Sequence, residues 1–188
     1  MPEPVAAGGC EALVVVDAQH VFTDPGSAWG SPMWAAARPH LLSRLAAYGE
    51  RAVLTRYVAP SAPAGAWVDY FTDWPWALVP PDHPLYALAP EVAQVVDGRP
   101  VVELTTFGKW GPELAGALRQ VGGREPVRSV EVVGLATDCC VVSTVLAMAD
   151  AGIAVTVTAE ACGGSTPSNH ERALALMELY APLVTVVR

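Results

Sequence analysis

Three chemically reactive side chains follow apolar runs of the kind that form buried strands. Asp17 comes directly after one run, Lys109 follows another after a four-residue linker, and Cys140 follows a third at the start of a predicted helix. Because ligands of open α/β sheets bind beyond the carboxyl ends of the strands, we expect the three side chains to meet at one edge. A carboxylate, an ammonium and a thiol together would suit nucleophilic catalysis.

The cysteine is placed where a helix would stabilise its anion. Cys140 falls in the first turn of the predicted helix, which Thr137 or Asp138 can cap. The positive end of the helix, its free amides and the Lys109 ammonium would lower the thiol pKa from about 8.5 toward neutrality. The sequence therefore predicts an activated nucleophile at Cys140.

A base and an oxyanion site would complete the catalysis. Asp17 could take the thiol proton during attack and return it to the leaving group. The backbone N–H groups of Ala136 and Cys140 could hold the oxyanion. The purely structural alternatives are that Asp17 caps a turn, that Lys109 is a solvated charge, and that Cys140 is a small buried hydrophobe. Lys109 is nevertheless the only lysine, since ten of the eleven basic residues are arginine.

Strand and helix patterns alternate along the chain. Continuous apolar runs predict strands at 12–16, 52–55, 101–104, 130–133, 153–158 and 183–187. Apolar residues at helical spacing predict helices at 33–48, from 112 onward, at 140–151 and at 168–179. The alternation predicts an α/β fold, a three-layer α/β/α sandwich around a mainly parallel six-stranded sheet.

Residues 57–90 break this alternation. They hold three of the six tryptophans, Trp67, Trp74 and Trp76, among many prolines, and form either a long covering loop or short broken helices. Long irregular segments in compact domains are usually functional, and the tryptophans argue against disorder. We expect one domain over residues 1–188, with 57–90 as a lid or insert.

Composition narrows the possible partners. The 11 Lys and Arg against 19 Asp and Glu give a net charge of −8, which repels nucleic-acid phosphates and anionic membrane surfaces. Apolar types make up 52% of the chain, yet no apolar run approaches the ~20 residues of a membrane span. The start MPEPVAAGGC lacks the basic and apolar regions of a signal peptide. We expect a cytoplasmic protein that acts on a small molecule, with no nucleic-acid and no membrane partner.

Three segments resemble the signatures of the isochorismatase-like cysteine hydrolases, and the similarity spans nearly the whole chain. They are LVVVDAQ (13–19), TTFGKWGPEL (105–114) and VVGLATDCCVVSTVLAMADAGIAVTV (132–157). The resemblance implies an isochorismatase-like, Rossmann-like fold. It also implies a catalytic triad of Asp17, Lys109 and Cys140, the cysteine lying in a G-x-x-T-D-x-C-V motif. A cis peptide bond just before Ala136 would turn backbone donors into the oxyanion hole.

Departures from the family pattern bear on cofactors. Nicotinamidases of this superfamily carry a metal site that begins in a T-R-D-x-H segment, whereas here Thr55-Arg56 is followed by Tyr57-Val58-Ala59, without carboxylate or imidazole. The four histidines are scattered along the chain. We therefore expect no metal and no cofactor. Because authentic isochorismatases lack the nucleophilic cysteine, Cys140 favours acyl chemistry.

The residues and the resemblance together predict a cysteine-dependent hydrolase, an amidase. It would cleave a C–N bond of a small amide, carbamoyl or ureido compound through a thioester. Three alternatives stay open: an isochorismatase-type vinyl-ether hydrolase, a non-catalytic small-molecule-binding member of the fold, and a thiol redox protein that uses Cys139 and Cys140. By resemblance we also expect a homodimer or homotetramer.

The substrate pocket is predicted from aromatic residues near the triad and in the 57–90 segment. The candidate walls are Phe22, Trp67, Phe71, Trp74 and Trp110, with core filling as the alternative for those in the segment. Cys139 is assigned to pocket lining or packing, and Cys10 and Cys162 to structure. Arg56 would bind a substrate carboxylate or form an ion pair.

Overall fold

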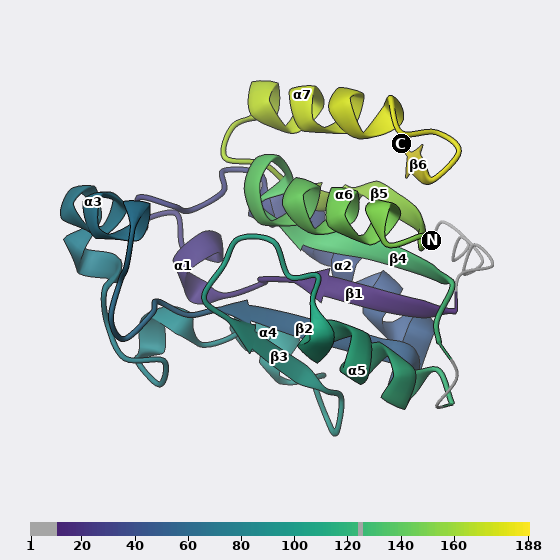
Figure 1. Ribbon diagram of the computed structural model, residues 1–188, viewed down its shortest axis with the longest axis horizontal. Helices are drawn as coiled ribbons and strands as arrows, with labels where there is room; N and C mark the ends of the chain where they lie inside the picture. Colours follow the sequence, from purple (N-terminus) through teal and green to yellow (C-terminus); the bar gives the residue numbers. More distant parts are fainter. Residues whose placement is uncertain (1–10, 124–125) are drawn as a thin grey trace.

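A six-stranded parallel sheet forms the centre of the computed structural model, which describes residues 11–123 and 126–188 (Figure 1). The strand order is β3-β2-β1-β4-β5-β6, and every pairing is parallel. The strands are β1 (Ala12–Val16), β2 (Ala52–Tyr57), β3 (Val101–Leu104), β4 (Ser129–Leu135), β5 (Ala154–Gly163) and β6 (Val184–Val187). All six strands predicted from apolar runs are confirmed.

Helices cover both faces of this sheet. Figure 1 shows α2 behind the sheet, against β1, β4 and β5, and α5 and α6 in front of it. The α-helices are α1 (His20–Thr23), α2 (Trp34–Tyr48), α3 (Ala66–Asp73), α4 (Pro90–Ala93), α5 (Pro112–Val121), α6 (Val142–Asp150) and α7 (Pro167–Glu178). The predicted three-layer α/β/α sandwich is confirmed. No helix within the described ranges is long and apolar enough to cross a membrane.

The segment between β2 and β3 forms short helices rather than an open loop. It contains α3, α4 and two 3-10 turns, Pro75–Ala77 and Pro84–Tyr86. Prolines stand in the first turn of both 3-10 turns and of α4, where a missing backbone N–H costs no hydrogen bond. In Figure 1, α3 and its neighbours lie beyond the carboxyl ends of β1 and β2.

The strand order reverses between β1 and β4, and the two strands approach closely there. Gly134 has a φ of +127°, and a Cβ built on it would lie 2.0 Å from the Val16 carbonyl oxygen. Only glycine accommodates both the left-handed backbone and the contact. The carboxyl ends of β1 and β4 therefore leave the sheet side by side, at the point where open α/β sheets bind ligands.

Candidate active site

A buried ion pair lies at the carboxyl end of β1. The Lys109 ammonium nitrogen is 3.0 Å from Asp17 Oδ2, and both side chains are 0% exposed. Thr55 Oγ1, on the adjacent strand β2, donates to Asp17 Oδ1 at 2.7 Å. Asp17 has a φ of +46°, a left-handed conformation that is uncommon outside glycine and that concentrates at functional sites. Lys109 is therefore a buried ion-pair partner rather than a solvated charge.

Lys109 is held from both its backbone and its side chain. Its amide donates to Thr144 Oγ1 on α6 at 2.9 Å, and its Nζ donates to the Thr106 carbonyl at 2.6 Å. Thr144 Oγ1 in turn donates to the Cys140 carbonyl at 2.6 Å. Because Thr144 bonds to both segments, it ties the loop that carries Lys109 to the turn that carries Cys140.

Cys140 lies in a π-helical turn, Thr137–Val141, that precedes α6. The predicted helix from residue 140 therefore begins with a wider turn, and neither predicted cap is formed at its start. Thr137 Oγ1 is 2.8 Å from His170 Nδ1, and the Asp138 carboxylate accepts hydrogen bonds from the Ser165 amide and hydroxyl at 2.7 and 2.6 Å. These contacts tie the π turn to α7 and to the residues just before it.

The surroundings of Cys140 keep its thiol protonated. A hydrogen bond with the Cys139 thiol, burial and the negative charge of Asp17 together raise the pKa of Cys140 well above its usual value, although Lys109 lowers it. The prediction that the helix start lowers the pKa of Cys140 is therefore wrong for this buried thiol. The hydrogen bond with Cys140 instead lowers the pKa of Cys139. Attack by Cys140 thus needs a base to take its proton.

These opposite shifts predict the order in which the two thiols react with iodoacetamide. A thiolate is the reactive form, so the lowered pKa of Cys139 and its partial exposure make it react first at pH 8. Alkylation of Cys140 should keep rising above pH 9, because its raised pKa delays formation of its thiolate. Peptide mapping of samples labelled at a series of pH values measures both rates.

Cys162 is an internal reference for this measurement. It is buried on β5, and burial raises its pKa to about 12, so it should stay unlabelled in the folded protein. Labelling of Cys140 ahead of Cys139, with a rate that levels off near pH 7, would contradict the prediction and restore the helix-activated thiolate. Cys10 lies outside the described residues.

The backbone that leads into the π turn bears on the predicted oxyanion donors. The peptide bond between Leu135 and Ala136 is cis, as the sequence resemblance implied. The amides of Cys139 and Val141 both donate to the Ala136 carbonyl at 3.0 Å. Those two amides are therefore already used, and the oxyanion role of the Ala136 and Cys140 amides stays a prediction.

Most predicted pocket residues belong to one aromatic cluster. Trp67 contacts Phe71 and Phe107, and Phe22 and Trp74 each contact Trp29. Trp110 is partly buried against the core, and within the described residues it makes no ring contact with this cluster. Phe71 is buried, which agrees with the core-filling alternative for that residue.

Sequence reasoning missed the residues at the centre of this cluster. Trp29 packs against five rings, and Tyr57 packs against four, including Phe107. Tyr57 ends β2, so its position at a strand's carboxyl end was the available signal. Arg56, which precedes it, lies 3.4 Å from Glu103 and donates to the Pro81 carbonyl at 2.7 Å, which supports the ion-pair alternative.

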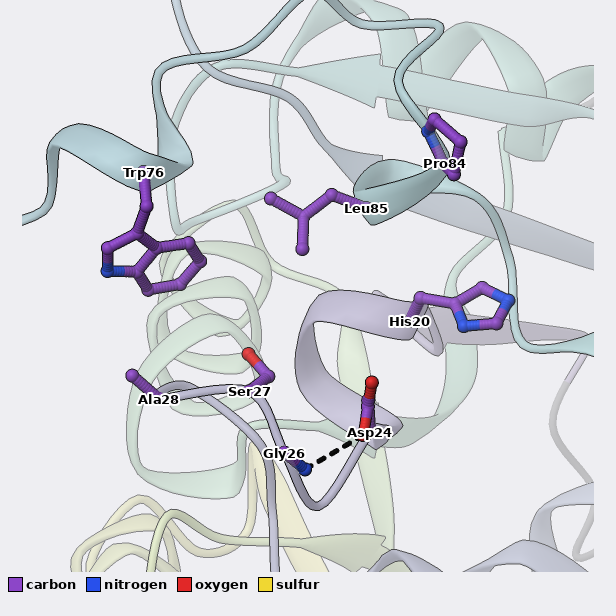
Figure 2. A pocket seen from close by; sticks show the side chains of 8 residues that line it. All are labelled: His20, Asp24, Gly26, Ser27, Ala28, Trp76, Pro84 and Leu85. Atoms are coloured by element: carbon purple, nitrogen blue, oxygen red, sulfur yellow. Dashed lines mark hydrogen bonds between the residues drawn. The ribbon is translucent and has the colours of Figure 1, made fainter.

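A surface hollow of about 590 Å³ borders this cluster at Trp76 (Figure 2). Its lining comes from the α1 region and from the segment between β2 and β3: His20, Asp24, Gly26, Ser27, Ala28, Trp76, Pro84 and Leu85. None of Asp17, Lys109 and Cys140 lines it. Trp76 is 37% exposed, and its ring is 4.8 Å from Trp29, which contacts Tyr57. Contacts thus run from Trp76 through Trp29 and Tyr57 to the Lys109 ammonium, which lies 5.1 Å from the centre of the Tyr57 ring.

Comparison with known families gives one match across nearly the entire chain. A family model described as Isochorismatase domain matches residues 11–187. Comparison with curated protein sequences gives no significant match.

Solved structures share the fold. Pyrazinamidase of Pyrococcus horikoshii in complex with zinc is 23% identical, with a TM-score of 0.72 over 94% of this chain and 98% of that one. A cysteine hydrolase from Pseudomonas syringae pv. phaseolicola is 19% identical, with a TM-score of 0.75 over 93% and 86%. The nicotinamidase SaPncA from Staphylococcus aureus is 18% identical, with a TM-score of 0.69 over 94% and 98%.

The side chains that the structure describes do not form a site for the zinc ion that is named for the Pyrococcus protein. In the part of the chain that the structure describes, no three His, Cys, Asp or Glu side chains stand close enough together to hold a metal ion. Tyr57 ends β2 among aromatic rings, and burial raises the pKa of its hydroxyl, which disfavours the phenolate that a metal would bind.

Proposed function

The chain belongs to the isochorismatase-domain family, and we propose that it is a cysteine-dependent amidase that cleaves the C–N bond of a small amide, carbamoyl or ureido compound. This proposal rests on the buried ion pair of Asp17 and Lys109, which lies where the strand order reverses. The charges of both residues act on the thiol of Cys140. Neighbours in fold that are named as nicotinamidase and pyrazinamidase make carboxamides the first class to test.

In the proposed first step, Cys140 attacks the carbonyl carbon and its proton passes to Asp17. Asp17 Oδ2 is suited to accept this proton, because no residue that the structure describes makes a hydrogen bond of good geometry to it. The Lys109 ammonium lies 3.0 Å away as an ion-pair partner. The raised thiol pKa means that proton transfer accompanies attack rather than preceding it. The amides of Ala136 and Cys140 hold the oxyanion of the tetrahedral intermediate.

The intermediate then collapses with cleavage of the C–N bond. Asp17 returns the proton to the departing nitrogen, which leaves as ammonia or an amine, and a thioester remains on Cys140. Water attacks the thioester carbonyl while Asp17 takes a water proton. When the C–S bond breaks, Asp17 returns this proton to the Cys140 sulfur, and the carboxylic or carbamic acid is released. Lys109 stays paired with Asp17 throughout and offsets the negative charge that develops on sulfur.

The thioester can be trapped. We expect incubation with benzamide, nicotinamide, acetamide or N-carbamoylglycine, followed by an acid quench, to show a protein whose mass rises by the acyl group of the accepted compound. The adduct should map to Cys140, and ammonia should appear in the same reactions. Ammonia release without any adduct, or an adduct on Cys139, would contradict the assignment of the nucleophile.

A further inference from the structure

The hydroxyl of Tyr57 is a buried polar group with no partner in the described part of the chain. Tyr57 is 0% exposed, and no hydrogen bond reaches its Oη. The neighbouring Tyr86 is buried as well, yet its hydroxyl donates to the Ala77 carbonyl. Native proteins seldom keep a buried hydroxyl unpaired unless water or a ligand completes its hydrogen bonding. The difference between these two tyrosines therefore points to a ligand at Tyr57.

The Tyr57 side chain lies at the reactive centre. The Lys109 ammonium is 5.1 Å from the centre of its ring, and the charges of Asp17 and Cys140 both act on its hydroxyl. Burial, with those charges, raises the pKa of Tyr57, so the hydroxyl remains protonated and can donate a hydrogen bond. Asp17 and Lys109 are already paired with each other.

Flat rings surround the same side chain. The ring centres of Phe22, Trp29, Tyr86 and Phe107 lie 6.4, 6.1, 5.8 and 5.9 Å from that of Tyr57. Aromatic walls with one polar group are typical of sites that bind small, flat, largely apolar molecules.

We propose that Tyr57 is a substrate-positioning residue whose hydroxyl donates a hydrogen bond to an acceptor atom of a small planar amide bound among these rings. This inference rests on the proposed function, because the amide must lie within reach of Cys140. Tyr57 takes no part in proton transfer. It holds the amide so that the carbonyl carbon faces the thiol.

Alkylation of Cys140 tests this without knowledge of the natural substrate. Iodoacetamide carries a planar amide with an acceptor oxygen, whereas iodoethane alkylates the same thiol and carries no acceptor. We expect Tyr57→Phe to lower the rate constant of Cys140 with iodoacetamide about tenfold and to leave the rate with iodoethane unchanged, since one hydrogen bond is lost. The midpoint of the pH profile of Cys140 should not move.

Tyr48→Phe is the matched control, because Tyr48 is buried on α2, outside this ring set, and its hydroxyl already donates to Glu131 at 3.0 Å. It should lower the unfolding temperature by removing that hydrogen bond, with labelling of Cys140 unchanged. Tyr57→Phe should leave the unfolding temperature unchanged or raise it.

Two results would overturn the inference while leaving the proposed function intact. One is an equal loss of rate with both reagents or a shifted pH midpoint, which would show that Tyr57 acts on the thiol. The other is an unchanged rate with iodoacetamide. Failure of the unmodified protein to react at Cys140 at any pH would instead overturn the proposed function, and this inference with it.

Discussion

Replacing Cys140 with alanine is expected to lower the turnover of an accepted amide by at least about a thousandfold, which corresponds to about 4 kcal/mol in the activation barrier. The loss should be this large because the proposed acyl transfer has no other nucleophile, and Asp17 and the backbone amides cannot form the thioester alone. Ammonia release from the amide identified by trapping gives the measurement. A side chain as small as alanine fits the space of cysteine, so the fold should lose only about 1 kcal/mol of stability.

The matched control for this loss is Cys162→Ala. Cys162 is a thiol on β5 that is almost fully buried, as Cys140 is. It has no part in the proposed chemistry. Its replacement should cost a similar small amount of stability and leave turnover within about twofold of the parent. If Cys140→Ala kept more than about a tenth of the parent turnover, the cysteine mechanism would fail and hydrolysis without a nucleophilic cysteine would take its place.

The sheet and its reactive edge could be predicted from the sequence because both depend on local patterns. Continuous β-branched runs such as 12–16 suit strands that are buried on both faces, and β1 is buried at every position. The predicted fifth strand stops at residue 158, whereas β5 continues to Gly163. Polar residues at 158 and 160 ended the apolar run, but alternate side chains there remain buried against the rest of the fold.

The properties of the site that depend on side-chain neighbours could not be predicted in the same way. The hydrogen bond with the Cys139 thiol is the first cause of the raised pKa of Cys140, followed by burial, and no periodicity encodes such a contact. Sequence reasoning considered Tyr57 only as a residue that cannot bind a metal, because the rings around it come from segments far apart in the chain. The placement of Trp29 against both Phe22 and Trp76 is likewise a tertiary contact.

Asp17→Asn is expected to destabilise the fold by about 3–5 kcal/mol, because it leaves the Lys109 ammonium buried without its partner. Asparagine has nearly the same shape and can still accept the Thr55 hydroxyl, so the loss reports the charge rather than packing. Turnover should also be lost, since asparagine cannot take the thiol proton. Urea unfolding of the parent and the variant, compared at equal slope, gives the free-energy difference.

The double variant Asp17→Asn with Lys109→Met separates stability from catalysis. Methionine fills much of the volume of the lysine stem without a charge, so the double variant should recover most of the stability lost in Asp17→Asn while remaining inactive. An Asp17→Asn variant as stable as the parent would contradict a buried, charged pair. Recovery of stability without recovery of turnover would instead show that the fold is stable without the ion pair. The pair would then be needed for catalysis and not for folding.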